Sequence, residues 1–265
     1  MRYFKLIVLI LCFQLIKSQN FYVETNNGYG IPFMKVFLGY TVDTSNFTQM
    51  NYGTYGGGAN FNIGGGYMFN DNIGLELMFN YVHGKTTLTN DLRKGFTEYR
   101  TDFARMFMAT PMFVAKSNAE KWNIIGKLGA VLPLGGGQIT EAFLSSKDLQ
   151  NPTVDNSVYL KIKTFGKFTI GTLLSLGIEY NLTEKMALTL ETQALLLHVK
   201  SKKSKVLAYK VYGEDKYNEW EKFGNTYETT FVDSYNSLNK GEAPSQISSY
   251  SALRFNLGFK FYINR

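Results

Sequence analysis

The C-terminal segment constrains the fold of this chain more than any other part of it. In residues 253–263, apolar and polar or small side chains alternate strictly. The apolar set is Leu253, Phe255, Leu257, Phe259, Phe261 and Ile263, and the other set is Arg254, Asn256, Gly258, Lys260 and Tyr262. Because only an extended chain places every second side chain on the same face, this pattern predicts a β-strand with one apolar and one polar face.

Seven further segments have similar alternation or strand composition, at about the 9–11 residues that a strand needs to cross a bilayer. The eight segments are residues 31–42, 59–69, 73–83, 99–114, 122–134, 168–180, 186–198 and 253–263. We therefore predict an all-β fold, a transmembrane antiparallel up-and-down β-barrel of eight strands. Residues 158–163, 206–212 and 226–235 also have strand composition. These segments either extend strands above the membrane or add a hairpin, so ten strands is the alternative.

The connections between these segments alternate in length. The short connections are residues 70–72, 116–121 and 181–185, and the long ones are 43–58, 84–98, 135–167 and 199–250. Outer-membrane barrels have short periplasmic turns and longer extracellular loops. The alternation therefore predicts a bacterial outer-membrane protein with both termini in the periplasm.

Residues 1–18 have the pattern of a secretory signal peptide, which leaves residues 19–265 as one barrel domain. Arg2 and Lys5 precede an apolar stretch, and Ser18 provides a small residue at the cleavage site. The only cysteine, Cys12, lies inside this segment, so the mature chain is expected to have no disulfide. The net charge is +7, and removing the three basic residues of the signal leaves about +4, too little to indicate a nucleic-acid partner.

The signal segment, the glycine-rich alternating strand at residues 57–69 and the C-terminal strand together resemble the small outer-membrane β-barrel family of the OmpA/OmpX type. The resemblance is to the members that consist of a barrel alone. It implies outer-membrane lipid and the barrel-assembly machinery as partners. That machinery recognises a C-terminal aromatic residue in many members of the family. Here Phe261 and Tyr262 precede three further residues, so the match is shifted.

Side chains alternate in direction along a strand, so the residues between the outward apolar ones are expected to point into the barrel. These residues include charges of both signs. The predicted lumen residues are Lys35, Glu76, Arg105, Lys127, Glu179, Glu191, Arg254 and Lys260. An eight-stranded barrel has an interior that side chains just fill. Since an unpaired buried charge is costly, we predict that these residues pair into a plug that fixes strand register. A gated or ion-selective pore lined by the same residues is the alternative.

The loop at residues 200–250 is the predicted site of extracellular contact. Its N-terminal part is basic and is followed by an acidic segment. Its aromatic side chains offer the rigid amphipathic surface that interfaces favour. The predicted contact residues are Tyr209, Tyr212, Tyr217, Trp220, Tyr227 and Tyr235. They suit an extracellular partner, whereas the lysines at the base of the loop suit anionic lipid headgroups.

The sequence offers little support for catalysis. Beyond the signal segment the only histidines are His83 and His198, and neither lies in the His-x-Ser pattern of outer-membrane lipid A deacylases. No metal-ligand spacing or phosphate-binding loop is present, so we predict no enzyme activity, cofactor or metal. The predicted roles are envelope integrity and adhesion-like surface contact. A small pore or carrier for ions or apolar solutes is the alternative, and a lipid-modifying enzyme is less favoured.

Overall fold

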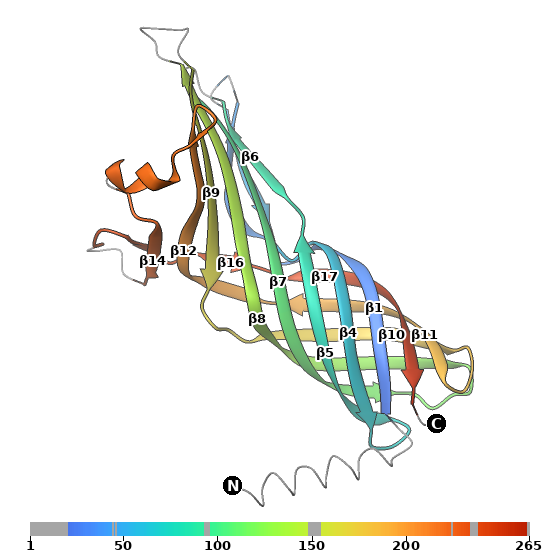
Figure 1. The fold of residues 1–265 in the computed structure, drawn as a ribbon. Coiled ribbons are helices and arrows are strands. Elements are labelled where there is room, and N and C mark those ends of the chain that lie inside the picture. The colour runs from blue at the N-terminus through green and yellow to red at the C-terminus, as the bar shows by residue number, and fades with distance from the viewer. Residues whose placement is uncertain are drawn as a thin grey trace, which may run out of the picture.

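The computed structural model describes residues 21–43, 45, 47–92, 96–147, 155–223, 225–233 and 238–263. Eight strands close into an antiparallel barrel, because the first pairs with the last and each of the others pairs with the next (Figure 1). They are β1 (Phe21–Pro32), β4 (Gly58–Met68), β5 (Ile73–Gly84), β7 (Phe96–Lys116), β8 (Trp122–Lys147), β10 (Gly171–Asn181), β11 (Met186–Leu196) and β17 (Ala252–Tyr262). The eight-stranded barrel is therefore confirmed, and the ten-stranded alternative is wrong. The predicted signal peptide lies outside the described residues.

The first barrel strand is not the predicted segment 31–42 but β1, which ends where that segment begins. Asn26, Asn27 and Gly28 are typical turn residues, and Asn27 interrupts the apolar face of β1. The barrel nevertheless holds this segment extended, because β1 pairs with β17 on one side and with β4 on the other. The pairing of two neighbouring strands thus overrides a weak local pattern.

The sheet of the barrel continues beyond one end of it as an open extension. Strands β7 and β8 are 21 and 26 residues long, far more than a membrane crossing requires. Additional strands pair with their projecting parts and with one another: β2 (Val36–Val42), β3 (Thr48–Gly53), β6 (Thr87–Asp91), β9 (Asp155–Gly166), β12 (His198–Val211) and β14 (Glu228–Val232). We call this region the extension sheet. The described residues of the segments at 158–163, 206–212 and 226–235 lie in this region and not in the barrel.

Three short elements complete the extension, namely β13 (Glu214–Asp215), β15 (Glu242–Pro244) and β16 (Ile247–Ser249), together with the 3-10 helix η1 (Tyr217–Phe223). At the opposite end of the barrel lie the three short turns and the paired ends of β1 and β17. Among the described residues, no helix is long and apolar enough to cross a bilayer.

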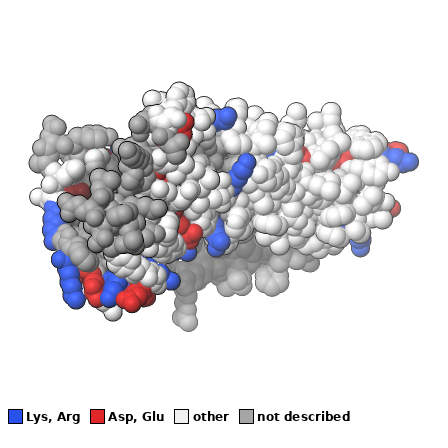
Figure 2. Space-filling view, turned by 90° about the horizontal axis from the view of Figure 1, so that it is seen from above, with Lys and Arg blue, Asp and Glu red and all other residues white. Residues whose placement is uncertain are grey.

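The outer surface of the barrel is apolar. In β17 the predicted alternation is observed, with Phe255, Leu257, Phe259 and Phe261 exposed and the intervening side chains buried. Figure 2 shows that charged side chains gather toward the end with the extension, while most of the barrel flank in that view lacks them. An apolar, charge-poor belt of this kind is what a barrel presents to lipid.

Two barrel glycines provide a test of how closely the strands approach each other. A Cβ atom on Gly28 would lie 2.0 Å from the Phe255 carbonyl oxygen and 2.1 Å from Asn256 Oδ1, whereas one on Gly126 would meet nothing within 4 Å. We expect Gly28→Ala to lower the free energy of unfolding by about 1–3 kcal/mol, because the strands must shift to accept the methyl group. Gly126→Ala is the matched control and should change it little. Urea unfolding in lipid bilayers measures both, and equal effects would contradict the close approach.

Candidate functional site

The centre of the lumen is a network of ion pairs around one lysine. Lys127 of β8 lies 2.9 Å from a carboxylate oxygen of Glu24, 3.1 Å from Glu76 and 2.7 Å from Glu191. All four side chains are excluded from solvent. They come from four different strands, so these contacts join distant parts of the barrel wall. A single cation thus holds three carboxylates that would otherwise repel one another.

The network continues toward the short turns through a second lysine. Lys260 lies 3.4 Å from Glu24 and 3.0 Å from Glu179. Lys116 also pairs with Glu179, and the Tyr262 hydroxyl donates a hydrogen bond to the same carboxylate at 2.8 Å. Four glutamates and three lysines therefore form one connected cluster that spans the lumen. An eight-stranded barrel has an interior that side chains just fill, and this cluster occupies part of it.

The structure brings most of the predicted lumen residues together. Those that lie buried in the lumen are Glu76, Lys127, Glu179, Glu191, Arg254 and Lys260. The placement of Lys35 and Arg105 was wrong, because both side chains are exposed. Lys35 follows the end of β1, beyond the barrel strands, since the first strand lies earlier in the chain than predicted. Arg105 lies between the buried Ala104 and Met106, and both faces of β7 are apolar enough to hide which one points inward.

Two members of the network were missed by the sequence analysis. Glu24 lies on β1, whose alternation is broken by polar residues on its outer face. Lys116 was assigned to a turn but ends β7 and reaches into the lumen. The alternation of Tyr22, Glu24 and Asn26 with Phe21, Val23 and Thr25 is the signal that could have identified Glu24.

Arg254 differs from the other lumen cations because it has no protein partner. Its side chain is fully buried, and none of its three guanidinium nitrogens forms a hydrogen bond within the described residues. Burial of an unpaired cation is unfavourable. Its neighbours across the strand pairs are Gly30 on β1 and Gln193 on β11, neither of which carries a charge. Arg254 is therefore in the lumen but outside the ion-pair network.

Toward the extension the lumen becomes apolar, which differs from the uniformly polar interior that was expected. The buried side chains of this apolar layer are Tyr55, Met78, Val82, Ala104, Met106, Met108, Met112, Val131, Leu173, Leu195, Leu197, Val199 and Tyr250. The segments that carry Tyr55 and Tyr250 fold over it, since the Tyr55 amide donates to the Ser249 carbonyl and the Tyr250 amide donates to the Leu197 carbonyl. The lumen is thus filled by an apolar layer next to a charged one.

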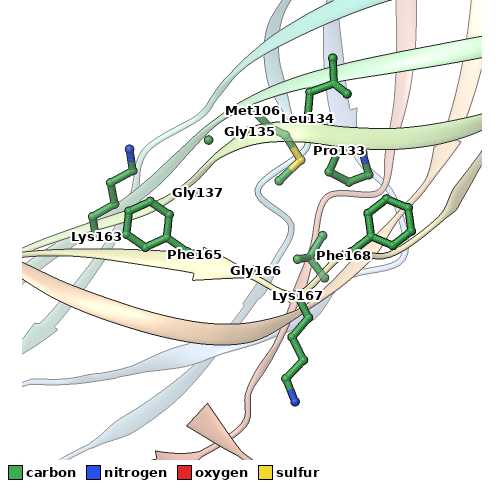
Figure 3. Close-up of a pocket in the computed structure, with 12 residues that line it drawn as sticks. Met106, Pro133, Leu134, Gly135, Gly137, Lys163, Phe165, Gly166, Lys167 and Phe168 are labelled. Atoms are coloured by element: carbon green, nitrogen blue, oxygen red, sulfur yellow. The ribbon is translucent and has the colours of Figure 1, made fainter. Parts of the chain in front are cut away.

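The barrel wall has a cavity where β8 passes from the barrel into the extension (Figure 3). Its volume is about 360 Å³, and its lining includes Gly135, Lys163, Phe165, Lys167 and Phe168. The sequence analysis placed Gly135, Lys163, Phe165 and Lys167 in the long connection 135–167, and Phe168 at the start of the next predicted strand.

A small polar cluster lies beside the cavity. Asp233 accepts hydrogen bonds from Ser245 at 2.6 Å and Lys167 at 3.2 Å, and Lys200 lies 3.0 Å away. The Ser245 hydroxyl, Lys200 and Lys167 together hold the pKa of Asp233 well below its ordinary value, so it stays ionised. Asp233 therefore joins the ends of β9, β12 and β14 electrostatically.

The aromatic residues predicted as a contact surface mostly pack against one another instead. The ring centroids of Tyr209 and Trp220 are 4.7 Å apart, and those of Tyr217 and Tyr227 are 4.8 Å apart. Trp220 Nε1 donates to the Thr226 carbonyl, and the Tyr227 hydroxyl donates to the Tyr217 carbonyl. These four rings therefore pack into a small aromatic cluster within the extension. Of the remaining two, Tyr212 is exposed, and Tyr235 lies outside the described residues.

Neither histidine belongs to a cluster that resembles a catalytic site. His83 of β5 is exposed and lies 3.5 Å from the Tyr81 hydroxyl, and His198 at the start of β12 is also exposed. In the part of the chain that the structure describes, no group of histidine and acidic side chains is arranged to hold a metal ion.

Comparison with known proteins identifies the family. Residues 20–261 match the family described as outer membrane protein beta-barrel domain. The chain belongs to this family. It is therefore a β-barrel of the bacterial outer membrane, and the predicted membership of the small outer-membrane barrels is confirmed. No curated protein sequence matches the chain.

Several solved outer-membrane barrels are similar to this family member in structure. OprG from Pseudomonas aeruginosa is 12% identical, with 94% of this chain and 98% of that one covered and a TM-score of 0.43. For Neisserial surface protein A the identity is 12%, the coverage 92% and 97%, and the TM-score 0.37. The attachment invasion locus protein Ail of Yersinia pestis is 13% identical, with 92% of this chain and 100% of that one covered and a TM-score of 0.31.

Proposed function

We propose that this outer-membrane barrel has a structural and surface-contact role, with no catalytic activity and no solute flow of its own. The observation that carries the proposal is the extension sheet, built on strands of 21 and 26 residues. A barrel needs only about 9–11 residues per strand to cross the membrane. The additional ordered strands have no role in the crossing, and they place a rigid surface far from the bilayer.

The proposed orientation puts the extension outside the cell and both termini in the periplasm. Its support is the contrast between the three short turns at one end and the extension at the other. Phe69, Trp122 and Phe261 are exposed at the end with the turns, where an interfacial aromatic belt belongs. The exposed aromatics of β17 make this strand the expected binding segment for the barrel-assembly machinery.

The filled lumen favours a structural role over the pore. Lys127 sits among three glutamates, and the apolar layer lies between it and the extension. Ions would have to disrupt the buried pairs and then cross a layer in which most side chains are apolar, and both steps are unfavourable.

The proposed contact surface is the outward face of the β2–β3 hairpin, which we call the hairpin face. It consists of Phe37, Tyr40, Met50 and Tyr52, all exposed. Phe37 pairs with Tyr52 across the hairpin, their ring centroids 5.9 Å apart, and Tyr40 pairs with Met50. Exposed aromatic and methionine side chains that adjoin one another are characteristic of protein–protein contact sites.

Adherence of bacteria that display the protein tests this role. We expect these bacteria to settle together, or to be retained on immobilised matrix proteins, more than bacteria without it. The triple variant Phe37→Ser, Met50→Gln and Tyr52→Ser should lose most of that gain, because a few buried anchors supply most of the energy of a contact. Tyr212→Ser is the matched control, since Tyr212 is an exposed aromatic at a turn of the extension, outside the hairpin face.

Unchanged adherence of the triple variant would contradict the role of the hairpin face. A steady conductance in planar bilayers from the purified wild-type protein would contradict the closed lumen and favour the pore.

A further inference from the structure

At one place along β8, the strand has a paired neighbour on one side only, so the barrel wall is interrupted there. The last pair between β8 and β10 is Val131 with Gly171, and the first pair between β8 and β9 is Gln138 with Thr164. Between these two pairs, residues 132–137 of β8 bond only to β7. The local sequence accounts for the break, because Pro133 has no amide hydrogen to donate and Gly136 and Gly137 have positive φ angles of 116° and 151°.

The wall cavity lies at this break and reaches both sides of the wall. Met106 and Val199, each only 4% exposed, line it from the apolar layer of the lumen. Leu134 and Phe168, 63% and 76% exposed, line it from the outer surface. In Figure 3, Phe165 and Phe168 flank the space between β8 and the end of β9. An apolar chain that enters from outside would therefore meet Leu134 and Phe168 first, and Met106 and Val199 farther in.

The break lies at the outer boundary of the hydrocarbon layer, given the proposed orientation. Leu134 is twelve residues along β8 from Trp122, the aromatic residue at the end with the short turns. Strands rise about 3.3 Å per residue and tilt about 40° in such barrels, so this stretch spans about 30 Å, the thickness of the hydrocarbon core. The cavity thus opens where lipid headgroups meet acyl chains.

Lysines surround the opening. Lys163 and Lys167 line the cavity. Lys163 and Lys203 approach the ring of Phe165 to 5.0 Å and 5.8 Å. Lys167 and Lys200 both form ion pairs with Asp233. Among the described residues, no carboxylate forms an ion pair with Lys163. The rim therefore has an excess of positive charge next to an apolar interior.

We propose that this break is a binding site for a phosphate-bearing amphiphile of the outer leaflet. Its phosphate lies on Lys163 and Lys167, and one acyl chain enters the wall between Phe168, Met106 and Val199. The charged rim disfavours an uncharged apolar solute as the main occupant, and the apolar lining disfavours a free anion. The inference rests on the proposed orientation but not on the hairpin face, so adherence and lipid binding are separate tests.

Binding of lipid A to the purified full-length protein, measured by native mass spectrometry in detergent, tests the proposal. Wild-type protein is expected to retain one bisphosphorylated lipid A molecule, and dephosphorylated lipid A should bind much more weakly. The double variant Lys163→Gln and Lys167→Gln should weaken binding of the phosphorylated lipid roughly thirtyfold, since each lysine contributes about fivefold. Lys202→Gln with Lys210→Gln is the matched control, because both lysines are exposed on β12 and neither lines the cavity.

A second variant tests the acyl-chain part of the site without a change in charge. A Cβ on Gly135 would meet nothing within 4 Å, so Gly135→Phe should fill the cavity and abolish lipid retention without disturbing the wall. Gly126→Phe is its control on the same strand, in equally open space. Three results would each overturn the proposal. They are equal retention of phosphorylated and dephosphorylated lipid A, equal lipid binding by the variants and the wild type, and complete competition by inorganic phosphate.

Discussion

Replacing Lys127 by methionine is expected to lower the free energy of unfolding by about 3–5 kcal/mol, because removal of one partner leaves buried charge without compensation. The lysine is the common partner of Glu24, Glu76 and Glu191, each within 3.1 Å. Without it, Glu76 and Glu191 lose the counter-charge that the described residues provide, and Glu24 keeps only Lys260, 3.4 Å away. Urea unfolding of the protein in lipid bilayers, followed by tryptophan fluorescence, measures the change.

Arg254→Met is the matched control for this prediction. Both cations are fully buried in the lumen, but Arg254 has no hydrogen-bond partner within the described residues. Its removal should therefore leave stability unchanged or raise it, because the cost of burying the guanidinium disappears. If the two variants lost equal stability, burial alone would explain the effect and the ion-pair network would not.

Leu176→Arg is expected to lower the free energy of unfolding by about 2–4 kcal/mol, the cost of a charge on the lipid face of a barrel near the bilayer midplane. Leu176 is 64% exposed and lies at the middle of β10. A leucine exposed to water tolerates arginine with little loss of stability. This variant therefore tests whether the apolar belt of the barrel faces lipid.

Leu207→Arg provides the comparison. Leu207 is 44% exposed on β12, in the extension sheet, where the proposed orientation places it in water. We expect a change within about 0.5 kcal/mol, as for ordinary surface substitutions. A large loss at Leu207, or none at Leu176, would place the membrane over a different part of the molecule.

The lumen shows how far strand alternation determines side-chain direction. In β17 and β11 the inward face is mainly polar, so the pattern predicted the inward direction of Arg254, Lys260 and Glu191. Lys127 of β8 also points inward as predicted, although the apolar Ile125 and Val131 share its face. In β7 apolar residues lie on both faces, and the direction of Arg105 was predicted wrongly. A shift of one residue reverses every side chain of a strand, so the pattern is informative only where the two faces differ in polarity.

The extension sheet shows where the sequence pattern is not sufficient. The strand composition of residues 158–163, 206–212 and 226–235 was evident, but it fits either a longer strand or an additional crossing. Their partners decide between the two: β9 pairs with the projecting part of β8, and β12 pairs with β9. The loop aromatics behave similarly, since rings such as Tyr209 and Trp220 become a core only when the chain folds back upon itself.

The sequence by itself determined seven of the eight crossings, the apolar belt and most of the charges that line the lumen, because these depend on residues close together in the chain. Only the tertiary structure decided the place of the first crossing, which charges pair, that Arg254 has no hydrogen-bond partner among the described residues, where the lumen becomes apolar and where the wall opens. Each of these depends on which strands become neighbours and in what register. That choice is made by the closure of the whole barrel, since every strand must satisfy its hydrogen bonds on both sides at once.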